Sequence, residues 1–496
     1  MMRSSSLPNL ILFCLLSILI LGSPDFAYTQ PIEDNPEDVP LNSMYDAAWL
    51  LSQYVAIPSV TGNEYLAAQF LKNQCRERGL HIESITDTIG CVNFAASLYP
   101  LNSKKPNIIF LNHIDVVEAN DSPEWIHPPY EGAIADNKVW GRGSFDNKGL
   151  AIAQLFAIEK FSSKAAGFDL PYNVTLLAVS GEEAGGFTGS AIVAKGFWEK
   201  FTPAVVIGEG GSGLDDIRFL PSGKTFFGIS VAEKGFLWLK LSCKIHSDGH
   251  ASVAGNDYAI KRLVDGLYKL ANKRQPVQMS TQTKQMFKSI GKSAGGLKGF
   301  AIKHINWLVF RPFLKHQVRL NPELESILCN KITISNLNET SSSLNQNAQE
   351  AIALLDCRYL PNSHPDEIIA TVKKILNDSV IHVSIERQGS LQYQTTPEFF
   401  FDELKKAIVQ TFPGAKVAPI LFPASSDNSY YRTSGCPVYG LNPMIVSARQ
   451  IQAIHNANEY IDLDDIETGI RVFENFLQSV LNSGMQTIPE SLTRQQ

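Results

Sequence analysis

The chain of 496 residues lacks the patterns that mark several common functional classes. Its seven cysteines are widely scattered and form no Cys-x-x-Cys pair, which argues against a zinc site made of thiolates. The net charge is -6 and no basic block is present, so nothing indicates nucleic-acid binding. The Gly-rich stretch at 141–149 fits neither GxxxxGKS/T nor GxGxxG, which disfavours a nucleotide site.

The N-terminus carries an apolar run at residues 10–21, which is short for a membrane span and suits the core of a signal peptide. Arg3 precedes this run, and Ala27 offers a small residue for cleavage. We therefore expect residues 1–27 to be a signal peptide or, as the alternative, an uncleaved anchor. The expected location is outside the cytosol: secreted, periplasmic or in the lumen of the secretory pathway. Export permits disulfides, but the cysteine spacing does not show which pairs form.

The length predicts more than one domain. Apolar, strand-like runs at 107–112, 173–179 and 204–208 alternate with helical patterns, which predicts an α/β fold with a mainly parallel sheet flanked by helices. From about residue 226 the pattern instead alternates like antiparallel strands, and the αβ pattern returns after Gly389. We expect one domain in two parts, 28–225 and 389–485. An inserted α+β unit at 226–388 lies between them, and residues 486–496 form a tail.

Three apolar strands are followed by acidic or imidazole side chains: His113 and Asp115, then Glu182 and Glu183, then Glu209. Ligands bind beyond the carboxyl ends of parallel strands, so these groups are expected at one edge of the sheet. An isolated Glu-Glu is more often a solvated turn, and His-x-Asp alone is more often structural. Together they favour a metal-dependent hydrolase, in which one carboxylate holds a metal while its neighbour handles a proton.

Two further residues extend this metal site. Asp146, at the Gly-rich turn before a helix, is placed to act as a bridging carboxylate. His455 precedes a helix of the same domain and supplies the second imidazole that a two-metal site needs. His113 and Asp115 lie two residues apart on a strand and so face the same side, which lets Asp115 orient the imidazole.

The segment 297–314 is unusually apolar and aromatic, with basic residues interspersed. A buried or packing helix is the favoured interpretation. Contact with a membrane surface or a lipid chain is the alternative.

In chain order the motifs are His113-x-Asp115, Gly-Arg-Gly-Ser-Phe-Asp146-Asn-Lys-Gly, Glu182-Glu183, Glu209 and His455. This ordered set resembles the dinuclear zinc amidohydrolase family that includes aminoacylase, carboxypeptidase S and glutamate carboxypeptidase, over residues 45–483. The combination of Trp-x-His-Pro-Pro-Tyr-Glu-Gly at 125–132 with Ala-Glu-Lys-Gly at 232–235 is most similar to the carboxypeptidase S and N-fatty-acyl-amino-acid hydrolase branch.

The resemblance implies two zinc ions per catalytic domain. His113 and Glu209 would bind one ion, Glu183 and His455 would bind the other, and Asp146 would bridge them. The same oxygen and nitrogen ligands would also accept cobalt or manganese.

The resemblance also implies two catalytic residues. Asp115 would orient His113. Glu182 would be the general base, taking a proton from the bridging water and passing it to the leaving amine.

The inserted unit resembles the family's lid, a ferredoxin-like domain, and a homodimer through this lid is one arrangement that the resemblance allows. His250 matches the lid histidine that stabilises the oxyanion, and Asn345 and Arg358 match a polar substrate-binding pair. The sequence departs from the family pattern at Asn345-Gln-Asn-Ala. It departs again at 426–429, where an expected Arg is absent and Arg432 is the candidate to replace it.

The expected reaction is hydrolysis of an amide bond next to a free carboxylate, in peptides or N-acyl amino acids. The aromatic segment 297–314 favours an apolar acyl chain. One alternative is an aminopeptidase, against which Arg358 argues. Another is a non-catalytic binding protein on the same fold, which would have lost a metal ligand or the base.

Overall fold

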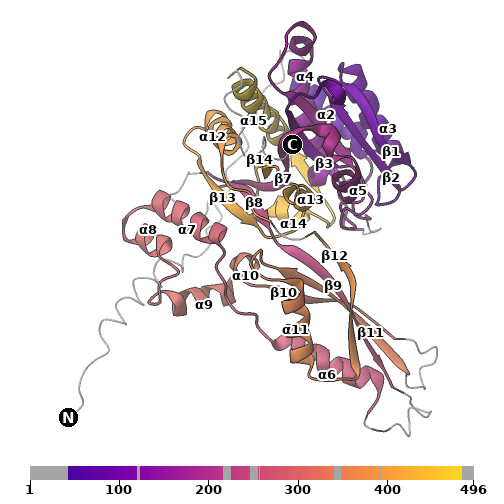
Figure 1. Ribbon diagram of the computed structural model, residues 1–496, viewed down its shortest axis with the longest axis vertical. Coiled ribbons are helices and arrows are strands. Elements are labelled where there is room, and N and C mark those ends of the chain that lie inside the picture. The colour runs from indigo at the N-terminus through magenta and orange to yellow at the C-terminus, as the bar shows by residue number, and fades with distance from the viewer. Residues whose placement is uncertain are drawn as a thin grey trace.

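The computed structural model describes residues 43–119, 123–215, 225–245, 255, 257–339, 348–390 and 393–482. The expected leader and tail lie outside these residues, as do His250 and Asn345. Figure 1 shows a larger body built on a sheet and a smaller, elongated body that extends from it. Among the described residues no helix is long and apolar enough to cross a membrane, and the six cysteines are unpaired.

The larger body is built on an eight-stranded mixed sheet whose central strands run parallel. Along one of these strands, Ile108 and Phe110 point into one apolar core, whereas Ile109 and Leu111 point into another. Because both faces are buried, the strand is a continuous apolar run in the sequence. Across the sheet the strands follow the order β1 (His81–Thr88), β2 (Cys91–Ser97), β6 (Asn173–Val179), β3 (Asn107–His113), β7 (Pro203–Leu214), β14 (Val438–Ile445), β8 (Phe226–Glu233) and β13 (Lys416–Phe422).

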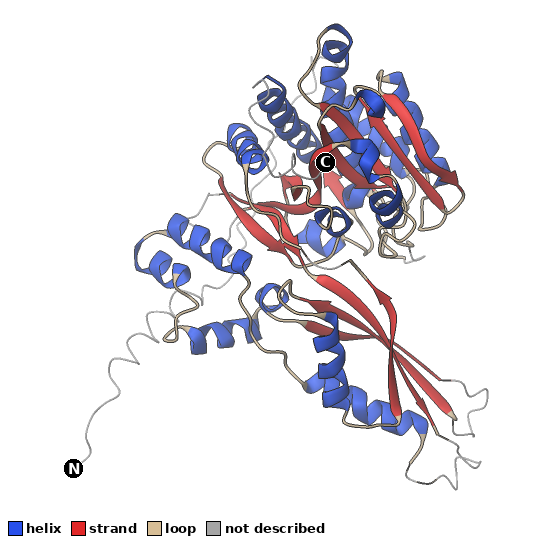
Figure 2. Ribbon diagram, viewed as in Figure 1, coloured by secondary structure: helices blue, strands red, loops and turns tan. Residues whose placement is uncertain are grey.

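Helices cover both faces of this sheet (Figure 2). One face carries α2 (Ser43–Val55), α3 (Tyr65–Glu77), α4 (Leu150–Gly167), α12 (Phe399–Thr411) and α15 (Leu463–Asn482). The other face carries the shorter α5 (Ser190–Gly196) and α13 (Asn428–Arg432). The expected α/β fold with a mainly parallel sheet and flanking helices is confirmed.

A small three-stranded sheet joins the two halves of this body. It consists of β15 (Tyr460–Asp462), β5 (Lys138–Trp140) and β4 (Ile134–Ala135). Since β15 pairs with β5, the segment after α14 (Ala448–Ala453) lies beside the segment that leads to Asp146.

The smaller body is a four-stranded antiparallel sheet covered on one face by two helices. Its strands are β10 (Lys331–Glu339), β11 (Glu350–Tyr359), β9 (Gly235–Lys244) and β12 (Ile381–Gln388). The helices are α6 (Ala259–Asn272) and α11 (Pro365–Leu376). Burial alternates strictly along β11, as expected when one face of a sheet is packed and the other is solvated.

The start of this inserted unit differs from the expected boundary at residue 226. Strand β8 pairs with β13, β14 and β7, so residues 226–233 belong to the eight-stranded sheet. The inserted sheet begins only with β9, at Gly235. A strand has the same local pattern in either sheet, and only its pairing partners separate the two cases.

Between α6 and β10 the chain forms four helices: α7 (Thr281–Ala294), α8 (Gly296–Lys303), α9 (Arg311–Leu320) and α10 (Pro322–Leu328). Segment 297–314 therefore spans two helices and the turn between them. The expectation of a buried or packing helix holds for only part of this segment. Ile305 and Leu314 are buried in a small apolar cluster of these helices, and Phe310 and Phe313 pack against this cluster. Large apolar side chains such as Leu297, Trp307 and Leu308 are exposed instead.

The contact between β3 and α15 provides a test of the larger core. The Phe473 ring is fully buried, with its centroid 4.7 Å from that of Phe110. We expect Phe473→Ala to lower the free energy of unfolding by about 3–5 kcal/mol, because it removes an aromatic side chain from a packed core. The exposed Phe168 is the control, and Phe168→Ala should change stability by no more than about 0.5 kcal/mol. Urea denaturation measures both, and equal midpoints for the two variants would contradict this packing.

Candidate metal centre

Three neighbouring strands carry acidic and imidazole groups to one edge of the eight-stranded sheet. Strands β6, β3 and β7 are adjacent and parallel, so their carboxyl ends meet there. His113 ends β3, Glu182 and Glu183 follow β6, and Glu209 lies in β7. Among the described residues, two groups of three side chains have potential ligand atoms that all lie within 4.8 Å of one another. One group is His113, Glu182 and Glu209, and the other is His113, Asp146 and Glu183.

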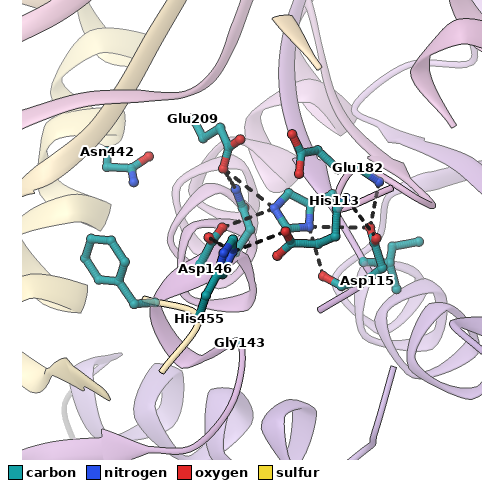
Figure 3. A network of polar contacts seen from close by, with 12 residues as sticks. His113, Asp115, Gly143, Asp146, Glu182, Glu209, Asn442 and His455 are labelled. Carbon is teal, nitrogen blue, oxygen red and sulfur yellow. Dashed lines mark hydrogen bonds and ion pairs between the residues drawn. The ribbon is translucent and has the colours of Figure 1, made fainter. Parts of the chain in front are cut away.

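Asp146 lies between two imidazoles, as Figure 3 shows. Its Oδ1 is 3.2 Å from Nε2 of His113, and its Oδ2 is 3.3 Å from Nε2 of His455. The same nitrogen of His455 is 3.2 Å from Oε2 of Glu183, and that of His113 is 3.6 Å from Oε2 of Glu209. The five side chains therefore form two halves that share one carboxylate.

A bulge in β7 directs Glu209 toward this centre. Gly208 pairs with Gly440 and Gly211 with Leu441, so two extra residues, 209 and 210, interrupt the ladder. Strand β7 continues to Leu214, beyond the end expected from the sequence. The Glu209 carboxylate accepts a hydrogen bond of 2.6 Å from Nδ2 of Asn147.

The Asp115 carboxylate holds the turn that carries Glu182 and Glu183. Its Oδ1 accepts the backbone N–H of Glu182 at 3.0 Å, and its Oδ2 accepts that of Glu183 at 3.1 Å and the Thr61 hydroxyl at 2.7 Å. The turn starts at Gly181, whose φ of +73° favours glycine.

Asp115 also contacts the imidazole that it was expected to orient. Nδ1 of His113 lies 2.9 Å from the backbone oxygen of Asp115 and 3.5 Å from its Oδ1. The carbonyl is therefore the nearer partner of the imidazole. It fixes the ring with Nε2 facing Asp146, while the carboxylate acts mainly on the Glu182–Glu183 turn.

Glu459 holds the loop that carries Asp146, although no motif in the sequence marks this residue. One oxygen accepts the backbone N–H of Gly143 at 3.0 Å and Nη1 of Arg142 at 2.7 Å. The other accepts the backbone N–H groups of Phe145, at 3.1 Å, and Asp146, at 3.0 Å. Since Glu459 follows His455 by four residues, one short segment supplies an imidazole and fixes the loop of the shared carboxylate.

The electrostatics of the centre suit a divalent cation. Burial raises the pKa of Glu182 well above its ordinary value, and Glu209 acts in the same direction. Burial also raises the pKa of Glu183 to about 7, with the Asp146 carboxylate adding to the shift. Oε1 of Glu183 is buried without a hydrogen-bond partner among the described residues. Crowded carboxylates with an unpartnered oxygen and two imidazoles match the donors that zinc and similar metals bind.

A cavity of about 750 Å³ opens from this centre. Glu182, Asp146 and His455 line one part of it. Its remaining walls are largely apolar and come from the sheet and lid strands and from α7, and they include Phe226, Phe236, Trp238, Met286, Ile290 and Ile420. A few polar side chains, Arg358, Ser425 and Asn442, also face the cavity. Asn442 carried no signal in the sequence.

Of the residues predicted to bind substrate, only Arg358 lies at the cavity within the described part of the chain. Arg358 lines the cavity, where its Nε donates to Asp356 at 2.9 Å and its Nη1 donates to Ser425 at 3.0 Å. Arg432, the candidate to replace the missing family arginine, is buried and lies 3.1 Å from Oε2 of Glu233. This ion pair leaves Arg432 away from the cavity lining, so that expectation is wrong. His250 and Asn345 lie outside the described residues.

Comparison with known proteins identifies the family. Residues 109–479 match the profile of peptidase family M20/M25/M40, which covers most of the chain. The chain belongs to this family. It is therefore an enzyme of a metallopeptidase family, and the resemblance seen in the motifs is confirmed.

Individual relatives agree with the expected branch. The chain is 27% identical over 383 residues to a probable carboxypeptidase S-like 2 of Dictyostelium discoideum, covering 76% of this chain and 72% of the relative. It is 22% identical over 452 residues to the human N-fatty-acyl-amino acid synthase/hydrolase PM20D1, covering 86% of each. The structure of human carnosine dipeptidase 1 has a TM-score of 0.66 and 17% identity, covering 88% of this chain and 96% of that one, and shows the same fold.

The protonation state of the centre leads to a prediction about metal affinity. Contacts with Asp146 and Glu183 raise the pKa of His455 to about 10, so near neutrality its imidazole carries a proton that a metal must displace. Affinity for added zinc should therefore rise with pH, by up to about tenfold per pH unit for each proton displaced. Competition with a chromophoric chelator between about pH 6 and 8 measures this slope. An affinity independent of pH, after correction for the chelator's own titration, would contradict it.

Proposed function

We propose that this enzyme uses two zinc ions to hydrolyse an amide bond next to a free carboxylate, with N-acyl amino acids bearing long apolar acyl chains as preferred substrates. The observation that carries the proposal is the shared carboxylate of Asp146 between His113 and His455, beside a largely apolar cavity that Asp146 and His455 line.

The two halves of the centre support a ligand set for each ion. His113 and Glu209 would hold one zinc, Glu183 and His455 the other, and Asp146 would contribute one oxygen to each. When bound, such ions polarise the substrate carbonyl and lower the pKa of water toward about 7.

Glu182 is the candidate general base. It lies beside the ligands without belonging to the shared-carboxylate set, and its raised pKa suits a group that must accept and then release a proton. Its carboxylate would take the proton of the attacking water and deliver it to the nitrogen of the leaving amine. The turn fixed by Asp115 keeps this carboxylate in place. His250 of the lid would stabilise the oxyanion that forms at the substrate carbonyl when water attacks.

The cavity supports the assignment of the substrate. Arg358 would bind the free carboxylate, because a guanidinium offers paired donors to a carboxylate. Asp356 and Ser425 hold this guanidinium at the cavity wall. Beyond it, the aromatic and aliphatic walls would bind an acyl chain. Each methylene of the chain that is buried there would contribute about 0.8 kcal/mol to the free energy of binding.

Substitution of the proposed base separates catalysis from metal binding. Glu182→Ala should retain the bound metal but lower kcat by about 10²- to 10⁴-fold, because it removes the proton carrier alone. Metal content by mass spectrometry and amine release from an N-acyl amino acid measure the two effects, with Glu182→Gln as the isosteric control. A Glu182→Ala enzyme as active as the wild type would exclude this role.

The substrate class is tested with matched pairs of compounds. Dipeptides and long-chain N-acyl amino acids are each supplied with a free or an amidated carboxylate, with and without a chelator. We expect chelator-sensitive amine release from the free-carboxylate members only. Arg358→Ala should reduce this selectivity by about tenfold or more, since it removes a charged hydrogen bond.

Other outcomes of the same panel favour the alternatives. Cleavage that instead requires a free substrate amine would indicate an aminopeptidase. No cleavage of any member by the metal-loaded protein would favour a binding protein on this fold.

A further inference from the structure

The helices α7 to α9 lie in a segment with an unusual distribution of charge. Residues 273–322 hold ten of the 43 basic residues and none of the 49 acidic ones. The rest of the chain therefore carries 33 basic and 49 acidic residues, a formal charge of -16. Nine of the ten cations are exposed, and these nine form no ion pair with any described carboxylate: Lys273, Arg274, Lys284, Lys288, Lys292, Lys303, Arg311, Lys315 and Arg319.

Large apolar side chains are exposed in the middle of this basic segment. Five of them occur within thirteen residues, and Leu297 and Leu308 are 90% and 79% exposed. The set comprises Leu297, Phe300, Trp307, Leu308 and Val309. Figure 1 shows α8 and α9 at the outer edge of the molecule. Exposed apolar side chains gathered in one segment mark an interaction surface rather than a folding core.

The following helix continues this surface with positive charge. Arg311, Lys315 and Arg319 are spaced four residues apart on α9 and form one exposed row, next to the row of the buried Leu314 and Val318. Lys315 and Arg319 also line a cleft of about 520 Å³ together with Lys273, Arg274 and Lys331. The acidic side chain in that lining, Glu325, already pairs with Lys331 at 3.1 Å. The cleft therefore offers uncompensated cations to an anionic headgroup.

The same helices lead back to the catalytic cavity. Ile302 of α8 packs against the cluster of Phe226, Ile290 and Ala418. Two members of that cluster, Phe226 and Ile290, line the cavity that opens from the metal centre. A single layer of apolar side chains thus lies between α8 and the space assigned to the acyl chain.

We propose that residues 297–309 and the basic face of α9, together called the α8–α9 face, dock on an anionic membrane surface and admit long-chain acyl substrates from it. Apolar side chains that enter the interface, flanked by cations that meet anionic headgroups, are the two components of peripheral membrane binding. A neutral partner would leave these nine exposed cations without complementary charge. Substrate access from the membrane rests on the proposed function, whereas docking does not.

Vesicle binding of the full chain tests docking without reference to activity. Vesicles of phosphatidylcholine with phosphatidylserine should bind about tenfold or more tightly than phosphatidylcholine alone, and added salt should weaken binding. Leu308→Asp should reduce this binding about tenfold. Ile89→Asp is the matched control, because Ile89 is 81% exposed on the distant β1–β2 turn and should leave binding unchanged.

A local measurement separates the α8–α9 face from binding by the N-terminal apolar run. Brominated lipids in the same vesicles should quench tryptophan fluorescence, and Trp307→Phe should abolish most of that quenching. Trp49→Phe is the control, since Trp49 is similarly exposed, at 58% against 47%, but lies on α2. Quenching that survives Trp307→Phe would overturn the proposal, as would equal binding of both vesicle types.

Two further outcomes are distinguishable. If Leu308→Asp turns a dimer into a monomer by light scattering while vesicle binding is unchanged, the α8–α9 face binds a second copy and the proposal fails. If vesicles bind as expected but no amide is hydrolysed, docking stands and the proposed function fails. If both hold, Leu308→Asp should slow hydrolysis of a vesicle-borne long-chain substrate but not of a short-chain one in solution.

Discussion

The shared carboxylate of Asp146 is the contact on which the rest of the site depends. Its two oxygens face the imidazoles of His113 and His455, which lie far apart in the chain. For this to happen the loop before α4 must meet the end of β3 and the segment after α14. Glu459 accepts hydrogen bonds from three backbone N–H groups of that loop and so holds the loop beside the segment after α14. The fold of the larger body thereby brings the imidazoles of two distant residues to the carboxylate of Asp146.

Burying several carboxylates at one sheet edge is unfavourable without a cation. Burial, and after it the neighbouring carboxylates, raise the pKa values of Glu182 and Glu183. Asp115 shows how the fold offsets part of this cost, because its charge is satisfied by two backbone N–H groups and a hydroxyl. The residual negative charge at the ligand atoms is what a pair of divalent cations would neutralise. Stability and metal affinity in this enzyme are therefore coupled.

Much of this arrangement was predictable from the sequence, because buried parallel strands are continuous apolar runs and their carboxyl ends share an edge. The role of Glu459 was not, since it depends on an approach between segments more than 300 residues apart. Strand β8 was misplaced because pairing partners leave no local pattern. The exposure of Trp307 and Leu308 was not predicted because an apolar segment is ordinarily buried. Only the tertiary structure shows that these two side chains are exposed.

The central claim is that one carboxylate joins two metal sites, and metal stoichiometry tests it most directly. Zinc-saturated protein, freed of excess metal, should contain two ions per chain. Asp146→Asn should lose affinity for both ions together, whereas His455→Ala should first lose the ion on the Glu183 side. A single bound ion in the wild-type protein, or an Asp146→Asn variant that retains two ions with unchanged affinity, would contradict the account.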